Sequence, residues 1–186
     1  VICGLRSNPL AGKPWLEHRD RRAAALEELE DAPPPATSAE RRRREQRTGH
    51  WYEIERRNAE RLIEAGCIVT IATDNYQGRA PEFRRMTKPE IQEAGIGSLI
   101  AIEGLVELGM SEMQAIVAAT RNGALACRGL QEFGTIEVGK SADMLLLDAS
   151  PLRDIRNIRR QSMVMARGQV IDIAALPRQR IFFTEP

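Results

Sequence analysis

The hydrophobic pattern around the middle of the chain predicts a helix followed by a buried strand. Four apolar residues lie on one side of a helix that starts near residue 50, and Gly66 can end that helix in the left-handed conformation. Residues 68–72 form an uninterrupted apolar, β-branched run, which is typical of a strand buried on both faces in a parallel sheet. The four residues are Trp51, Ile54, Leu62 and Ile63.

The region before this unit is predicted to contain two more helices. Residues 17–30 are rich in Ala, Leu, Glu and Arg and are expected to be helical, with no helix before about Trp15. Prolines in residues 31–38 stop that helix, because they remove N–H donors and exclude the helical conformation before them. A second helix covers residues 39–47. Its Arg41–Arg44 run lacks interleaved aromatic residues, which favours a solvated face over a phosphate-binding patch.

Beyond the strand, a polar loop at residues 76–86 precedes several helices. Thr87 with Glu90, and Ser111 with Gln114, have the spacing of capping boxes that start helices. Two apolar stripes follow, and core packing explains them better than a cofactor site does. The stripes are Leu99, Ile102, Leu105 and Val106, then Met113, Ile116, Val117 and Thr120.

The last part of the chain consists of short apolar segments between glycines, which is typical of β-strands and turns. Met144–Leu147 is an apolar strand, and residues 163–173 form a hairpin with its turn at Arg167-Gly168. We expect the strand at 144–147 to belong to a different sheet from the strand at 68–72. The boundary between the two parts is expected near Leu130.

Composition places the chain among ordinary globular proteins. It has 186 residues, 42% hydrophobic and 28% charged, with a net charge of +1, which gives no overall attraction to nucleic acid or membranes. No apolar run approaches the ~20 residues of a membrane span, and no secretory signal opens the chain, so a cytoplasmic location is expected. Because the chain begins with Val1, we expect it to be processed or cut from a longer protein.

The three cysteines are expected to be reduced and mostly buried. Cys3, Cys67 and Cys127 are odd in number and widely spaced, and no second Cys or His stands at ligand spacing from any of them. This pattern argues against both a disulfide framework and a zinc site.

Asp74 is the candidate functional residue that the pattern itself singles out. It stands where the predicted parallel strand passes into its loop, and ligands of α/β folds bind at that edge of the sheet. Asp also commonly caps turns, so the pattern alone leaves a functional and a capping role equally open.

The chain also carries four longer motifs in a fixed order. They are N-A-E-R-L-I-E-A-G-C-I-V-T-I-A-T-D-N at 58–75, G-L-V-E-L-G-M-S-E-M-Q-A-I-V-A-A-T at 104–120, A-T-R-N-G-A-L-A at 119–126 and F-G-T-I-E-V-G-K-S-A-D-M-L-L-L-D at 133–148. In content and order they resemble the C-terminal part of the metal-dependent amidohydrolase superfamily, in its imidazolonepropionase-like and dipeptidase-like branch. The resemblance covers about residues 50–173.

The resemblance implies an α/β fold. Residues 1–130 would form the last β/α segment of a (β/α)8 TIM barrel, with 31–47 as a linker or basic insertion, and 131–186 a small β-sandwich-type module. A complete barrel needs about 250 residues, so only part of it fits in this chain. By position, Asp74 would ligate the metal and move a proton between the attacking water and the leaving group. Glu103 and the module's motif residues (Gly134, Gly139, Lys140, Ala142 and Asp143) are interpreted as structural.

The family's histidine ligands have no counterpart in this sequence. His18 and His50 are its two histidines, and neither lies in a ligand motif. We therefore expect a divalent metal, with zinc as the expected ion, in the complete protein and none in this chain alone, which would be inactive. The expected partners are a small amide or peptide substrate and a missing N-terminal barrel segment or partner chain, with a homo-oligomer also considered.

Two alternatives to this enzyme interpretation are kept. The chain could be a non-catalytic remnant that acts as a structural or interaction module. A nucleic-acid-binding module using Arg41–Arg44 is the weakest interpretation, because the net charge is near zero and aromatic residues are missing from the run.

Overall fold

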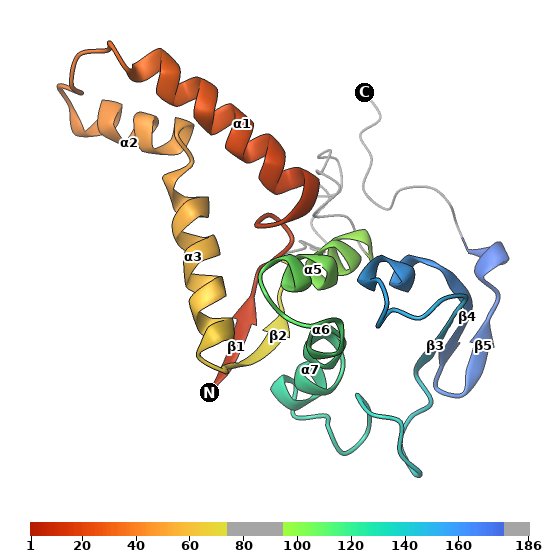
Figure 1. The fold of residues 1–186 in the computed structure, drawn as a ribbon. Helices are drawn as coiled ribbons and strands as arrows, with labels where there is room; N and C mark the ends of the chain where they lie inside the picture. The colour runs from red at the N-terminus through yellow and green to blue at the C-terminus, as the bar shows by residue number, and fades with distance from the viewer. Residues whose placement is uncertain (74–94, 177–186) are drawn as a thin grey trace, which may run out of the picture.

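Figure 1 shows the computed structural model, which describes residues 1–73 and 95–176. Residues 74–94 and 177–186 lie outside the described part. Asp74, the predicted loop at 76–86 and the predicted capping box at Thr87 and Glu90 therefore lie outside the described residues.

Two short parallel strands form the first sheet. Strand β1 (Ile2–Leu5) pairs with β2 (Ile68–Ile71), with Cys3 opposite Val69. The structure confirms the predicted strand β2, but the prediction that it is buried on both faces was wrong. Val69 is 1% exposed, whereas Ile68 is 41% exposed, because the described part of this sheet has two strands and leaves the start of β2 uncovered. The sequence analysis did not assign β1, because its four residues show no periodicity and its partner lies more than sixty residues away.

Three helices connect β1 to β2 and form an arm that extends away from the sheet (Figure 1). They are α1 (Gly12–Leu29), α2 (Ser38–Arg47) and α3 (His50–Glu64). The expectation of no helix before Trp15 was wrong, since α1 begins at Gly12. A proline at position 14 does not prevent this, because N–H groups in the first turn have no acceptor within the helix.

The ends of these helices follow the sequence signals. Thr37 and Glu40 form a capping box at the start of α2, and Arg41–Arg43 are exposed, which confirms the solvated face. Gly66 adopts a φ of +71° after α3, and the N–H of Cys67 donates to the carbonyl of Leu62 at 3.1 Å. This is the expected left-handed helix end.

The prediction that Trp51 lies on the packed side of α3 was wrong. Trp51 is 74% exposed, whereas Ala59 on the same helix is 3% exposed. The neighbouring residue Tyr52, which points to another side of α3, packs against His18 of α1 instead. Helical periodicity identifies a stripe, but it does not show which side of the first turn of α3 a neighbouring helix covers.

The core lies between β2 and three helices. These are α5 (Ile96–Glu107), α6 (Glu112–Ala119) and α7 (Arg121–Ala126), and both α6 and α7 contact β2. Leu105 of the predicted stripe is completely buried. In α6 the small residues Ala115 and Ala118 are buried instead of the predicted Met113, which is 52% exposed, because close approach to the strand favours small side chains.

A second sheet follows the helices. Strands β3 (Met144–Leu147), β4 (Gln161–Ala166) and β5 (Gln169–Ile171) are antiparallel in the order β3-β4-β5. Their separation from β1 and β2 confirms the prediction of a different sheet. Arg167 and Gly168 both have positive φ, as a tight hairpin turn requires.

Two 3-10 helices complete the described part of the chain. Helix η2 (Ile155–Arg159) contacts α5 and buries Ile155 and Ile158, each 7% exposed. Helix η3 (Ile173–Ala175) follows β5. Through η2, the segment between β3 and β4 joins the hydrophobic core beside α5.

The expectation of reduced cysteines was wrong for two of the three. Cys3 and Cys67 form a disulfide with a Cα–Cα distance of 6.4 Å, and Cys127 is free and exposed rather than buried. Parallel pairing of β1 with β2 places the residue before β2 next to β1. Sequence spacing could not show this proximity, because the two cysteines are 64 residues apart.

Among the helices that the structure describes, none combines the length and apolar character that crossing a membrane would require.

Candidate functional site

The carboxyl ends of β1 and β2 meet at one edge of the first sheet, because the strands are parallel. The last backbone hydrogen bond between them runs from the N–H of Ala72 to the carbonyl of Leu5, at 2.9 Å. Beyond it lie the loop Ser7–Ala11 on one side and Thr73 on the other. This is the edge at which α/β folds bind ligands.

The loop Ser7–Ala11 is buried, which is unusual for a connection between elements. Several of its polar groups have partners inside the protein, as buried backbone requires. The hydroxyl of Ser7 donates to the carbonyl of Ala101 at 2.6 Å, and the N–H of Leu10 donates to the carbonyl of Ser7 at 3.0 Å. The guanidinium of Arg56 donates to the carbonyl of Leu10. The loop is therefore fixed between α3 and α5.

Asn8 links the two strand ends. Its side-chain amide donates to the carbonyl of Thr73 at 3.0 Å, and the residue is 1% exposed. Asp74 follows Thr73 in the sequence but lies outside the described residues, so its role stays a prediction.

Helix α3 is attached to the same edge by charged side chains. Arg6, directly after β1, contacts both carboxylate oxygens of Glu55, at 2.9 and 3.2 Å. Arg56 lies over the ring of Trp15 at 4.9 Å and pairs with Glu60 at 3.0 Å. These contacts attach α3 to the end of β1 and to α1.

A cleft of about 590 Å³ lies beside the loop, between α1, α5 and η2. Its two α5 carboxylates are engaged: Glu103 accepts from Arg159 at 2.5 and 2.9 Å, and Glu107 accepts from the N–H of Gly12 at 2.7 Å. Glu103 thus connects α5 to η2, which agrees with its structural interpretation. Glu107 caps the start of α1, where a negative charge is favourable.

His18 is a packing residue of the arm. It is 8% exposed, lies edge-on to Tyr52 at 4.8 Å and contacts Trp15 at 5.6 Å. A Cβ on Gly49 would lie 1.8 Å from the imidazole, so the corner between α2 and α3 requires glycine. Burial lowers the pKa of His18, against the opposing effect of Glu53, and favours the neutral ring.

The described residues do not form a metal centre. Among residues 1–73 and 95–176, no group of three or more His, Cys, Asp or Glu side chains could hold an ion. His18 lies in the arm, and the side chain of His50 lies outside the described part. The described residues therefore cannot bind a metal by themselves. Side chains that bind a metal would have to come from outside the described part of the chain or from another segment.

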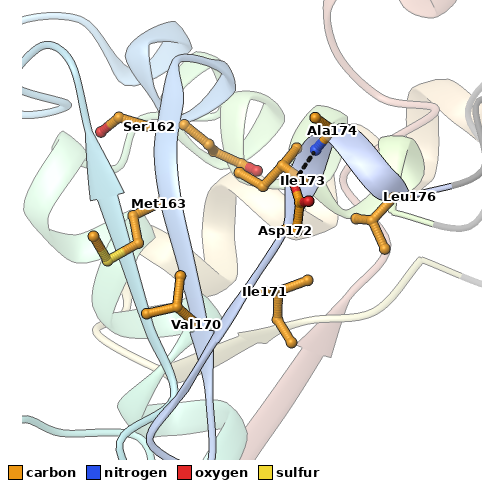
Figure 2. Close-up of a pocket in the computed structure, with 9 residues that line it drawn as sticks. Ser162, Met163, Val170, Ile171, Asp172, Ile173, Ala174 and Leu176 are labelled. Atoms are coloured by element: carbon orange, nitrogen blue, oxygen red, sulfur yellow. Dashed lines mark hydrogen bonds between the residues drawn. The ribbon is translucent and has the colours of Figure 1, made fainter.

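The second sheet carries an apolar groove of about 870 Å³ (Figure 2). Met163, Val170 and Ile173 are among the residues that line it. The carboxylate of Asp172 accepts from the N–H of Ala174 at 3.0 Å, as Figure 2 shows, so it caps η3. Ser162, which also lines the groove, donates its hydroxyl to the carbonyl of Leu146 at 3.2 Å.

The motif at the start of the second sheet is structural in this structure. Asp143 accepts from the N–H of Arg167 at 2.7 Å and from the hydroxyl of Ser141 at 2.9 Å, and these bonds lower the pKa of its carboxyl. Lys140 pairs with Glu137 at 3.2 Å. Asp143 thereby ties the start of β3 to the hairpin turn.

Two buried asparagines were missed by sequence reasoning. Asn122, inside the motif at 119–126, donates to the carbonyl of Val69 in β2 at 2.8 Å. Asn8 stands in a Ser7-Asn8-Pro9 stretch that reads as loop punctuation. One sequence feature could have identified Asn8. Ser7 and Asn8 are two polar residues shortly after the apolar run of β1, and such residues are expected at the end of a strand once the run is recognised as one.

Comparison with known families gives one match that covers most of the chain. The family model described as "Amidohydrolase family" matches residues 37–171. This range contains β2, the core helices and the second sheet, and the buried edge at Ser7–Ala11 precedes it.

Curated relatives with similar sequences are imidazolonepropionases. The protein from Syntrophobacter fumaroxidans is 42% identical over 101 residues, which cover 52% of this chain and 20% of the relative. The protein from Brevibacillus brevis is 28% identical over 127 residues, covering 67% of this chain and 27% of the relative. The chain therefore spans about a fifth to a quarter of these relatives.

Solved structures give a similar result. Phenylurea hydrolase B has a TM-score of 0.59 and 30% identity, over 90% of this chain and 34% of that chain. Molinate hydrolase has a TM-score of 0.57 and 36% identity, over 67% of this chain and 28% of that chain. In both cases the matched part is about a third or less of the neighbour's own length.

Proposed function

Since the chain belongs to the amidohydrolase family, we propose that it is the C-terminal part of a metal-dependent hydrolase of C–N bonds in amides, cyclic amides or peptides. The observation that carries this proposal is the edge where β1 and β2 end, with Asp74 next in sequence after Thr73. That edge is the part of a parallel sheet where catalytic groups gather.

In this proposal, residues 1–130 are the last β/α segment of a (β/α)8 barrel, and 131–186 are a β-sandwich-type module. The parallel pairing of β1 with β2 and the separate antiparallel sheet support this division. Further barrel strands would come from an N-terminal segment or a partner chain.

Asp74 carries the proton transfer. Its carboxylate takes a proton from the water that attacks the scissile carbonyl carbon, and it then gives that proton to the leaving nitrogen. The proton count balances over the reaction, so the carboxylate is regenerated for the next turnover.

Members of this family generally bind a divalent metal, and we propose zinc for the complete protein, with Asp74 as one ligand. A catalytic zinc needs about three protein donors. Because the described residues contain no such group, the remaining donors belong to the missing segment or partner.

The proposed substrates are small amides or peptides. The relatives' names point to an imidazolone propionate, molinate and phenylureas. These names support hydrolysis at a carbonyl carbon that bears nitrogen more than they support any one substrate.

The test uses the full-length protein and the variant Asp74→Asn. The panel is an imidazolone propionate, molinate, a phenylurea and an Xaa-Pro dipeptide, each assayed with added Zn²⁺. Asp74→Asn should lower kcat by about 10²- to 10⁴-fold without changing the circular dichroism spectrum, because Asn keeps the shape but cannot take a proton. Near-normal turnover by the variant would refute the role of Asp74, and no turnover of any substrate by the wild type would support the non-catalytic alternative.

A further inference from the structure

The disulfide closes the arm at its base. Cys3 lies in β1, and Cys67 lies between the end of α3 and the start of β2. The chain between them contains the three helices of the arm, so the bond joins the two ends of this segment covalently (Figure 1). Opening or closing the bond therefore changes the constraint on the arm as a whole.

The bond lies at the amino end of the first sheet, where the strands are open to solvent. Cys3 and Cys67 are both partly exposed. Their neighbours Ile2 and Ile68, which form the first pair of the parallel register, are 39% and 41% exposed. Thiol–disulfide exchange requires a thiolate to reach one of the two sulfur atoms. A small dithiol can approach this bond while the core stays closed.

The pairing of the two strands does not depend on the sulfur atoms alone. The backbone ladder runs along the whole of β1, and the N–H of Ala72 donates to the carbonyl of Leu5 at 2.9 Å. The N–H of Cys67 donates to the carbonyl of Leu62 at 3.1 Å, which fixes this residue to the end of α3. After reduction these contacts keep the two thiols near each other, and such proximity favours re-formation of the bond.

We infer that Cys3 and Cys67 form a reversible redox switch that tightens or loosens the base of the arm. In the reducing direction, a thiolate of a dithiol attacks one sulfur, the Cys3–Cys67 bond breaks, and the released sulfur takes a proton. The second thiol of the reductant then displaces the other cysteine from the mixed disulfide. The pair gains two electrons and two protons, and the dithiol becomes a disulfide. A small disulfide such as oxidised glutathione reverses both steps and is itself reduced to two thiols.

A switch differs from a structural disulfide in the state of the chain that reacts. A bond that is protected by the fold is reduced after unfolding, so its reduction becomes faster with urea, which raises the unfolded population. A bond that is accessible in the folded protein is reduced at a rate that low urea does not change. The dependence of the rate on urea, well below the unfolding transition, therefore separates the two cases.

The experiment uses the full-length protein, first oxidised with glutathione and then treated with dithiothreitol. Alkylation and mass spectrometry of the peptides that carry Cys3 and Cys67 follow the two thiols separately from all other cysteines. Both thiols should appear at a rate independent of low urea, and oxidised glutathione should restore the bond once the dithiothreitol is removed. A rate that rises steeply with urea, or a reduced protein that cannot re-form the bond, would overturn the inference.

Amide hydrogen exchange tests the effect of the switch on the fold. Reduction should accelerate exchange in peptides from β1 by about 30- to 1,000-fold, the range that corresponds to typical disulfide stabilisation. Peptides from the second sheet should not change. The double variant Cys3→Ser with Cys67→Ser should match the reduced wild type, and Cys127→Ser should respond to dithiothreitol as the wild type does. Equal exchange of β1 in the oxidised and reduced protein would contradict the switch, and neither measurement depends on turnover.

Discussion

At the scale of single residues, His18 makes the stability of the arm depend on pH. Burial lowers its pKa in the folded state below the ordinary value of 6.5, while nearby Arg21 and Arg22 act in the same direction and Glu53 and the carbonyl of Gly49 oppose them. As pH falls below about 6.5, the unfolded chain binds a proton before the folded chain does. The free energy of unfolding should then decrease.

Thermal unfolding of the wild type and His18→Gln between pH 8 and pH 5 checks this prediction. Near pH 8 His18 is neutral in both the folded and the unfolded chain, so the difference in melting temperature between the two proteins should not depend on pH there. Below that, the wild type should lose stability faster than the variant. Parallel curves over the whole range would show that His18 does not titrate differently on folding.

Buried asparagines show what single residues in a sequence can and cannot reveal. Asp74 stands out because a carboxylate follows an apolar run. Asn8 and Asn122 do not stand out, because each side-chain amide donates a hydrogen bond to a carbonyl that is distant in the sequence. These carbonyls belong to Thr73 and Val69 respectively. Such pairs exist only after the strands have been placed.

At the scale of elements, the disulfide Cys3–Cys67 should stabilise the pairing of β1 with β2. It closes a loop of 64 residues, for which the chain-entropy model gives about 4 kcal/mol. Reduction, or Cys67→Ser under oxidising conditions, should therefore lower the melting temperature clearly. In the reducing cytoplasm that the sequence led us to expect, the two thiols would stay free.

Cys127→Ser is the control for this prediction, because Cys127 is free and exposed. Cys127→Ser should have the same melting temperature as the wild type without reductant. With reductant, both proteins should lose the same amount of stability. An unchanged melting temperature for Cys67→Ser would show that strand pairing does not depend on the bond.

Elements that carry their own periodicity were predicted well, and those defined by a partner were not. The strand β2, the capping box at Ser111 and Gln114, and the hairpin at Arg167-Gly168 all have local signals. Strand β1 is four residues with no alternation, so only its pairing with β2 makes it a strand. Trp51 is the converse case, since it belongs to a predicted stripe but is 74% exposed, whereas Ile63 of the same stripe packs against the core.

At the scale of the whole molecule, one face of the second sheet should make the isolated chain associate. Cross-strand pairing puts five apolar side chains on this exposed sheet face: Met144, Leu146, Met163, Met165 and Val170. Leu146 is 57% and Val170 60% exposed. Contiguous apolar surface of this kind favours contact with another protein surface or aggregation.

Leu146→Lys with Val170→Lys should reduce this association, as measured by analytical ultracentrifugation of the isolated chain. Gln169→Lys adds a charge to the opposite face of the same sheet and is the matched control. A wild-type chain that is monomeric at high concentration would contradict the prediction.

The arm contacts the rest of the protein near its base. A change at its far end should therefore leave those contacts intact. Glu107 of α5 holds the start of α1, and Arg6, directly after β1, binds Glu55 of α3. The exposed prolines at 33 and 34 lie beyond all of these contacts. A reporter peptide inserted there would leave the strand ends in place, which offers a site for labelling the protein without disturbing its chemistry.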